Sequence, residues 1–277
     1  MTPEEKIIQI KNLGIENLCI LSDFDDTISK GIKSDGTKSS NSFSVYVNNP
    51  DLMGEQMNKE ISRLYNFYYP IEQDPNMPKQ EKEKIIVKWW ESTFKEYKKH
   101  GYCKDTIKKI VDNKLMELKD KTDEFLEFTV KHNIDTVIFS AGIYNLIHKF
   151  LELNHVDHKN IHVVANKFKF DESGFFTHTY GDIIHSMNKT FFELSRIPVY
   201  EELTQKKSCI ILGDSLSDTY MTKGANFQVE LKIGFLNTLP EDPAYKMRLK
   251  AHQEKFDIVL QGQEDFTKIN KILKQII

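Results

Sequence analysis

Five short apolar runs, spaced along a chain of 277 residues, most constrain the fold that this sequence can adopt. Each run has the length of a buried strand rather than of a helix. The five runs are residues 18–21, 136–139, 161–164, 209–212 and 257–260. Because strands that alternate with helices form parallel sheets covered by helices, we expect an α/β fold.

The segments between these runs carry helix and turn signals. Thr2, Pro3 and Gly14 mark the ends of a first helix. Further helices are expected at residues 51–69, 79–99 and 264–276, with two or three more within residues 104–132. A proline-bracketed turn is expected at residues 68–75, and a hairpin at residues 167–179.

Most of the expected helix follows the first strand. Residues 30–44 are rich in Ser, Gly, Lys and Asn, so we expect a mobile loop there. We therefore predict a catalytic core of residues 1–29 and 134–277. Residues 30–133 would form a mainly helical cap inserted after the first core strand.

The charge balance excludes several classes of partner. Lys and Arg number 38 against 41 Asp and Glu, a formal net charge of −3. Only three of the 38 are arginines, so the planar forks that bind nucleic-acid phosphates are mostly missing. No run approaches the roughly 20 apolar residues of a membrane helix, and the first residues show no signal-peptide pattern. We expect a monomer that binds neither nucleic acid nor a membrane.

The cysteines indicate the compartment. Cys19 and Cys209 lie in apolar runs, Cys103 is distant from both, and no C-x-x-C pair occurs. Buried free thiols are typical of a reducing environment. We therefore predict a cytoplasmic protein.

Three of the apolar runs end in polar turns that carry chemistry. These turns are residues 23–27, 140–142 and 213–218. Ligands of open parallel sheets bind beyond the carboxyl ends of the strands, so the three turns are expected to form one site.

The contents of these turns indicate phosphoryl transfer. Four converging carboxylates would repel one another, and oxygen ligands suit Mg²⁺. A hydroxyl, two backbone amides at an expected helix start and a lysine would bind an anion. The carboxylates are Asp23, Asp25, Asp214 and Asp218, and the anion contacts are Ser140, Ala141, Gly142 and Lys189.

A mechanism follows from this set. Asp23 would attack the phosphorus and form an aspartyl-phosphate, while Asp25 would serve as general acid and then as general base. Mg²⁺, Ser140 and Lys189 would neutralise the phosphate oxygens.

Structural interpretations stand beside these roles. Asp214 and Asp218 would also suit a helix N-terminus, and Ser140 a helix cap. Lys189 would otherwise be solvated, with Lys167 as its substitute. Asp26 is interpreted as a turn residue.

The order of these motifs resembles that of the haloacid-dehalogenase-like phosphatases and, within them, the cytosolic 5′-nucleotidase III family. The resemblance covers about residues 16–277. Three places depart from the family pattern: residues 30–46, Lys88 and Ser217. The closer likeness rests on residues 22–25, 68–75, 139–143, 170–172, 185, 188–189, 212–215, 231–234, 245 and 257–260.

The resemblance implies further roles. Asp23, Asp214 and the Asp25 carbonyl would hold Mg²⁺, with Asp218 at the second acidic position. Glu72 would contact the nucleoside base, and the cap would close over the substrate. Members that act on 7-methylguanosine monophosphate have two tryptophans where this chain has Trp89 and Trp90, and an aromatic face suits a cationic base. Both tryptophans would otherwise be structural, and Glu72 a solvated turn acid.

We therefore expect a Mg²⁺-dependent 5′-nucleotidase acting on CMP, UMP or 7-methylguanosine monophosphate. Three alternatives remain. A related phosphatase of small metabolites, such as a phosphoserine phosphatase, would need a fixed cation in its cap. A nucleoside phosphotransferase would pass the phosphoryl group to a nucleoside. A non-catalytic nucleotide-binding protein should have lost part of the site.

Overall fold

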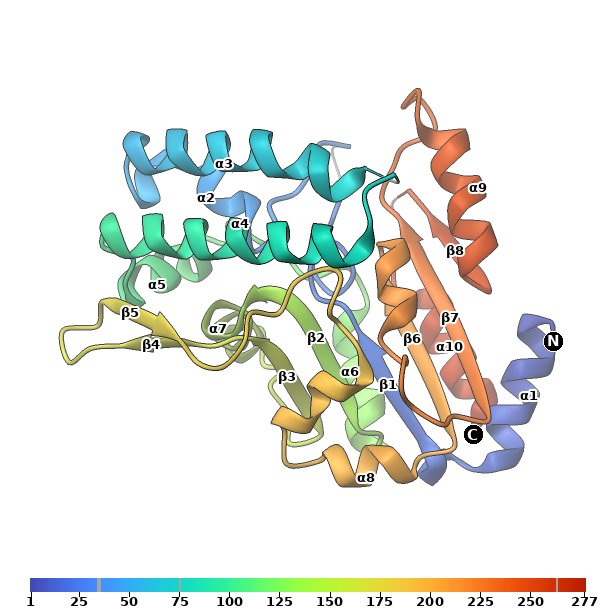
Figure 1. The fold of residues 1–277 in the computed structure, drawn as a ribbon. Helices are drawn as coiled ribbons and strands as arrows, with labels where there is room; N and C mark the ends of the chain where they lie inside the picture. The colour runs from blue at the N-terminus through green and yellow to red at the C-terminus, as the bar shows by residue number, and fades with distance from the viewer. Residues whose placement is uncertain (34–35, 75, 263) are drawn as a thin grey trace.

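The computed structural model describes residues 1–33, 36–74, 76–262 and 264–277, with the side chain of residue 73 excepted. Within these ranges, six parallel strands form one sheet in the order β3-β2-β1-β6-β7-β8 (Figure 1). The predicted α/β fold is confirmed. The strands are β1 (Leu18–Ser22), β2 (Thr136–Ile143), β3 (Ile161–Asn166), β6 (Ser208–Gly213), β7 (Val229–Leu236) and β8 (Ile258–Gln261).

The central strand β1 explains why the sheet is covered on both faces. All five of its residues are buried, and alternate side chains point to opposite faces. Ile20 packs into the core on one face, whereas Cys19 and Leu21 pack into a second core on the other. A strand buried on both faces reads as a continuous apolar run, which is why the sequence showed it clearly.

Helices form the two outer layers. The first face is covered by α1 (Pro3–Leu13), α6 (Thr122–Lys131), α7 (Tyr144–Leu153) and α10 (Thr267–Ile276). The second is covered by η3 (Phe191–Arg196), α8 (Tyr200–Gln205) and Met221, the residue after η4 (Leu216–Tyr220). Helix α9 (Tyr245–Lys255) packs beside β7 and β8. The first helix begins as predicted, with Thr2 and Glu5 in a capping box and Gly14 at its end.

A second helical group follows β1. It contains α2 (Ser44–Asn48), η2 (Pro50–Leu52), α3 (Glu55–Gln73), α4 (Lys79–Lys99) and α5 (Lys104–Asp112). Helices α3 and α4 pack side by side across the end of the sheet at which the strands finish (Figure 1). The predicted hairpin is present as β4 (Phe168–Phe170) and β5 (Phe176–Thr179), and Phe94 of α4 packs on both of its strands. The division into core and inserted cap stays a prediction.

The expected turn at residues 68–75 is wrong over most of its length. Residues 68–73 continue α3, with Pro70 inside the helix, and the chain leaves the helix at Asp74. Residue 75 lies outside the described residues. Because Leu64 and Tyr68 pack into the core at helical spacing, tertiary packing outweighs the local cost of the proline.

The expected loop at residues 30–44 is packed against the molecule over residues 39–42. Ser39, Ser40 and Ser42 are buried, and α2 begins at Ser44. Ser42 donates a hydrogen bond to Asp25 in the turn after β1, so polar contacts order a segment with little apolar content. Residues 34 and 35 of this segment lie outside the described residues.

One strand, β7, was not expected. It pairs with both β6 and β8, but Glu230 and Lys232 alternate with its apolar residues at its start. The Asp257 carboxylate stabilises this part of the strand, since it accepts the Lys232 backbone N–H at 2.8 Å.

Candidate active site

A buried lysine joins two carboxylates at the centre of the site. Lys189 Nζ lies 2.5 Å from Asp23 Oδ1 and 2.7 Å from Asp218 Oδ1. All three side chains are at least nine-tenths buried. Lys189 is therefore not a solvated lysine, and Lys167 lies elsewhere, 5.0 Å above the ring of Tyr144. Asp23 and Lys189 are 166 positions apart in sequence. They meet because the turn after β1 and the loop before η3 lie at the same edge of the sheet.

Side-chain hydrogen bonds shape the loop that presents Lys189. Asn188 Oδ1 accepts the His185 N–H at 2.8 Å, and its Nδ2 donates to Ile183 O. Asn166, at the end of β3, bonds both the Ala141 carbonyl (2.7 Å) and the backbone of Ile184. Asn166 thus ties the last residues of β2 to the lysine loop.

Three carboxylates form a possible cation site. Oxygen atoms of Asp23, Asp214 and Asp218 lie within 4.8 Å of one another. Asp218 also closes a capping box, since its Oδ2 accepts the Ser215 N–H at 2.9 Å. A Cβ on Gly213 would lie 2.4 Å from Asp218 Cβ, so only glycine fits at this turn. The structural and functional interpretations of Asp218 are therefore compatible.

The electrostatics of the three carboxylates favour a cation. Burial raises the pKa of Asp23, Asp218 raises it further, and Lys189 opposes both effects. Burial also raises the pKa of Asp214 well above its ordinary value, with contributions from Asp26 and Asp218. A divalent ion would favour the ionised form of these two carboxylates, so the donor set fits a hard metal.

Asp25 lies beside the nucleophile candidate but has different partners. Its Oδ1 accepts the Ser42 N–H at 2.7 Å and its Oδ2 the Ser42 hydroxyl at 2.5 Å. Burial raises the pKa of Asp25 to about 6, and the Ser42 hydrogen bonds act in the opposite direction.

The next residue, Asp26, lies in a turn as expected and is partly buried. It adopts a left-handed backbone with φ of 60°, which aspartate tolerates better than most residues. Its Oδ1 is buried without a hydrogen-bond partner among the described residues.

The turn after β2 differs in detail from the expectation. Residues 140–143 finish β2, and α7 begins only at Tyr144, so the expected helix start lies further along the chain. Ser140 is buried, and its Oγ accepts the Gly142 N–H at 2.9 Å. The Ser140 hydroxyl can still donate its own hydrogen, for example to a phosphate oxygen.

The candidate base contacts lie in the helical group above the site. Glu72, near the end of α3, accepts a hydrogen bond from the Ser186 hydroxyl, three residues before Lys189. Trp89 is buried and stacks on Tyr68 at 5.8 Å, whereas Trp90 is half-buried against Phe43 and Phe94. Trp89 is thus packed inside the aromatic cluster, whereas Trp90 is partly exposed.

Sequence reasoning missed several residues around the site. Ser42 lay in a polar stretch that gave no signal. His252 of α9 places Nε2 2.9 Å from the Asp214 carbonyl oxygen. Lys119 is buried 4.6 Å from the centre of the Phe235 ring, and burial lowers its pKa to about 8. None of the three lies beside the end of a strand, so the pattern that found the other site residues does not include them.

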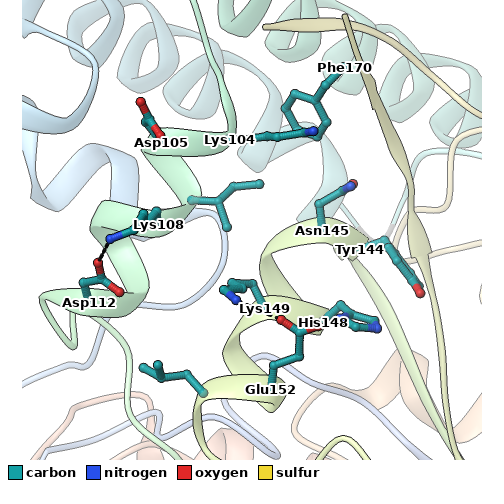
Figure 2. A pocket seen from close by; sticks show the side chains of 12 residues that line it. Lys104, Asp105, Lys108, Asp112, Tyr144, Asn145, His148, Lys149, Glu152 and Phe170 are labelled. Carbon is teal, nitrogen blue, oxygen red and sulfur yellow. Dashed lines mark hydrogen bonds and ion pairs between the residues drawn. The ribbon is translucent and has the colours of Figure 1, made fainter. Parts of the chain in front are cut away.

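A separate cavity lies away from these residues. It encloses about 580 Å³ between α5 and α7 (Figure 2). Several of its charged side chains pair along their own helices, Lys108 with Asp112 and Lys149 with Glu152. It shares no residue with the carboxylate site.

The fold and the site together define a class of protein. Two aspartates follow the first core strand, a serine lies near the end of the second, and a buried lysine and a final aspartate pair complete the set. On a parallel sheet, this is the arrangement of the haloacid-dehalogenase-like phosphatases. A solved structure of a probable phosphoserine phosphatase from Vibrio cholerae shares this fold, with a TM-score of 0.59 and 11% identity over 95% of this chain and 66% of that chain.

The chain belongs to the family described as "Pyrimidine 5′-nucleotidase (UMPH-1)", whose model matches residues 26–277. The 7-methylguanosine phosphate-specific 5′-nucleotidase of Mus musculus is 31% identical over 99% of this chain and 89% of its own length. A solved structure of cytosolic 5′-nucleotidase IIIB bound to cytidine matches with a TM-score of 0.84 and 29% identity, over 99% of this chain and 90% of that one. The chain is therefore a 5′-nucleotidase, a phosphoric monoester hydrolase.

Proposed function

We propose that Asp23 is the nucleophile of this 5′-nucleotidase and Asp25 its general acid and base. In the first step an Asp23 oxygen attacks phosphorus, the bond to the nucleoside 5′ oxygen breaks, and Asp25 gives that oxygen a proton. In the second step Asp25 takes a proton from water, which attacks the aspartyl-phosphate and releases phosphate. A pKa of about 6 suits a group that both gives and takes a proton near neutral pH.

Lys189 and Ser140 would bind the phosphate oxygens. Lys189 already contacts Asp23, so an oxygen of a phosphate bound to Asp23 would lie within reach of the same ammonium. Both side chains are buried, and a water-poor site strengthens such contacts.

Phosphatases of this fold are generally metal-dependent, and we propose Mg²⁺ as the metal. Asp23 and Asp214 would hold it, with the Asp25 carbonyl and Asp218 nearby. When bound, it supplies positive charge against the phosphate oxygens and lowers the cost of the clustered carboxylates.

We further propose 7-methylguanosine monophosphate as the preferred substrate. The supporting observation is a cluster of aromatic side chains beside the site, on the helices that also carry the carboxylate of Glu72. An aromatic face and an anion both favour a cationic base over a neutral one. The cluster consists of Phe43, Tyr65, Tyr68, Tyr69, Trp89 and Trp90. The names of relatives from several animals support the same base.

A pyrimidine monophosphate is the second candidate. The family description names pyrimidine nucleotides, and the solved relative is bound to cytidine. An aromatic surface also stacks on neutral bases, with less discrimination.

A panel of monophosphates tests this proposal. With Mg²⁺ present, kcat/KM for 7-methyl-GMP is expected to exceed that for CMP and UMP by about tenfold, the scale of one cation–π contact. Trp90→Leu is expected to remove that advantage, because Trp90 is the tryptophan of the pair that stays partly accessible. Equal kcat/KM for all bases in the parent protein would contradict the preference.

A nucleoside added as acceptor would reveal any phosphotransferase activity as new monophosphate.

The remaining expectations are also proposals. We propose a cytoplasmic location, supported by the word cytosolic in the names of relatives. Among the described residues, none of the helices has the length and apolar character needed to cross a bilayer. A small-molecule substrate fits the family, and the monomeric state stays a prediction.

A further inference from the structure

Ser42 occupies both oxygens of the Asp25 carboxylate. Its backbone N–H and its hydroxyl donate to different oxygens, at 2.7 and 2.5 Å. Ser42 is 2% exposed, so its two donors are shielded from water. Two hydrogen bonds to one carboxylate fix its plane as well as its position.

The surroundings of Ser42 hold it in place from two sides. A Cβ on Gly142 would lie 2.3 Å from Ser42 Oγ, so the serine fills the space between Asp25 and the end of β2. On the chain side, Asn41 Oδ1 accepts the Ser44 N–H at 2.8 Å, and Ser44 Oγ accepts the Asn41 N–H at 2.9 Å. These reciprocal bonds rigidify the backbone that presents Ser42.

The next residue connects this contact to the helices above. The Phe43 ring lies 6.0 Å from Tyr65 of α3 and 6.1 Å from both Trp89 and Trp90 of α4. Ser42 and Phe43 are adjacent, so the position of the Asp25 carboxylate is set partly by aromatic packing of the helical group.

We infer that Ser42 is a positioning residue that aims the Asp25 carboxylate at the leaving 5′ oxygen of the substrate. Ser42 contacts the Asp25 carboxylate and would act on the substrate only through it. The inference rests on the proposed role of Asp25 as general acid, and it adds a residue from the 30–46 segment to the machinery of that role.

Leaving-group dependence separates this role from a general loss of structure. A nucleoside 5′ oxygen needs a proton as it leaves, whereas p-nitrophenolate leaves without one. In Ser42→Ala, kcat/KM for a nucleoside monophosphate is expected to fall about tenfold to 100-fold, and kcat/KM for p-nitrophenyl phosphate less than about threefold. The ratio kcat/KM is used because it reports steps up to departure of the leaving group.

Two further variants complete the test. Ser42→Cys keeps the size of the side chain with a weaker donor, so it is expected to fold and to lie between the parent and Ser42→Ala. Ser39→Ala is the matched control, because Ser39 is a buried serine of the same segment whose Oγ has no hydrogen-bond partner among the described residues. Ser39→Ala is expected to leave kcat/KM unchanged for both the nucleoside monophosphate and p-nitrophenyl phosphate.

The outcome for Asp25→Asn distinguishes the two levels of the account. In that variant kcat/KM for the nucleotide should fall about 10²- to 10⁴-fold, and kcat/KM for p-nitrophenyl phosphate should fall far less. Suppose that Asp25→Asn gives this result. If both Ser42 variants then lower kcat/KM equally for the two substrates, or for neither, the inference is overturned and the acid role stands. If Asp25→Asn also lowers both substrates equally, the acid role fails and the inference fails with it.

Discussion

Asp23→Asn is expected to lower kcat for phosphate release by about 10⁴-fold or more, because the amide cannot form the aspartyl-phosphate. Asparagine has nearly the same shape, and it removes a buried carboxyl whose pKa is raised by burial. Lys189 keeps Asp218 as a partner in this variant, so the free energy of unfolding is expected to change less than in Lys189→Met. Phosphate release from a nucleoside monophosphate and urea unfolding give the two values.

The neighbouring aspartate supplies a control for this variant. Asp26→Asn alters the same turn, and asparagine also tolerates the left-handed backbone at that position. Its kcat is expected to fall less than about tenfold, since Asp26 has no role in the proposed covalent step. Comparable kcat in Asp23→Asn and the parent protein would contradict the role of Asp23 as nucleophile.

Lys189→Met is expected to reduce stability and activity together. Without the ammonium, the buried carboxylates of Asp23 and Asp218 lose their partner, and breaking a buried pair in this way costs about 3–5 kcal/mol of unfolding free energy. Loss of a fixed charge at the phosphate is expected to lower kcat by about 10²- to 10³-fold. Urea unfolding in the absence of divalent cations measures the first effect.

Two comparisons make the stability result specific. Lys149→Met removes an exposed lysine paired with Glu152, and it is expected to change stability by less than about 1 kcal/mol. Added Mg²⁺ should narrow the difference between Lys189→Met and the parent, because the cation would pair with the same carboxylates. A Lys189→Met protein as stable as Lys149→Met would show that the buried ion pair has no structural importance.

The sequence predicted the parts of the fold that are encoded locally. The apolar runs of β1, β2 and β6 are buried on both faces, so their residues read as continuous strands. The acidic turns after β1 and β6 were expected to meet because parallel strands finish at one edge, and Asp23 and Asp218 do meet there through Lys189.

The parts that were missed depend on contacts between distant segments. Strand β7 contains Lys232, whose N–H is bonded by Asp257, and no local pattern shows that pairing. Helix α3 continues through Pro70 because its apolar side chains pack into the core. Ser42 is one of several serines in a polar stretch, and only the folded chain shows that it contacts Asp25.

The central claim, a covalent intermediate on Asp23, is tested most directly by acid quenching the enzyme during turnover of a nucleoside monophosphate and analysing its peptides by mass spectrometry. The account predicts one phosphoryl group on the peptide that contains Asp23, present in the parent protein and absent in Asp23→Asn. A phosphoryl group on a different peptide, or none on the Asp23 peptide while phosphate is being released, would contradict it.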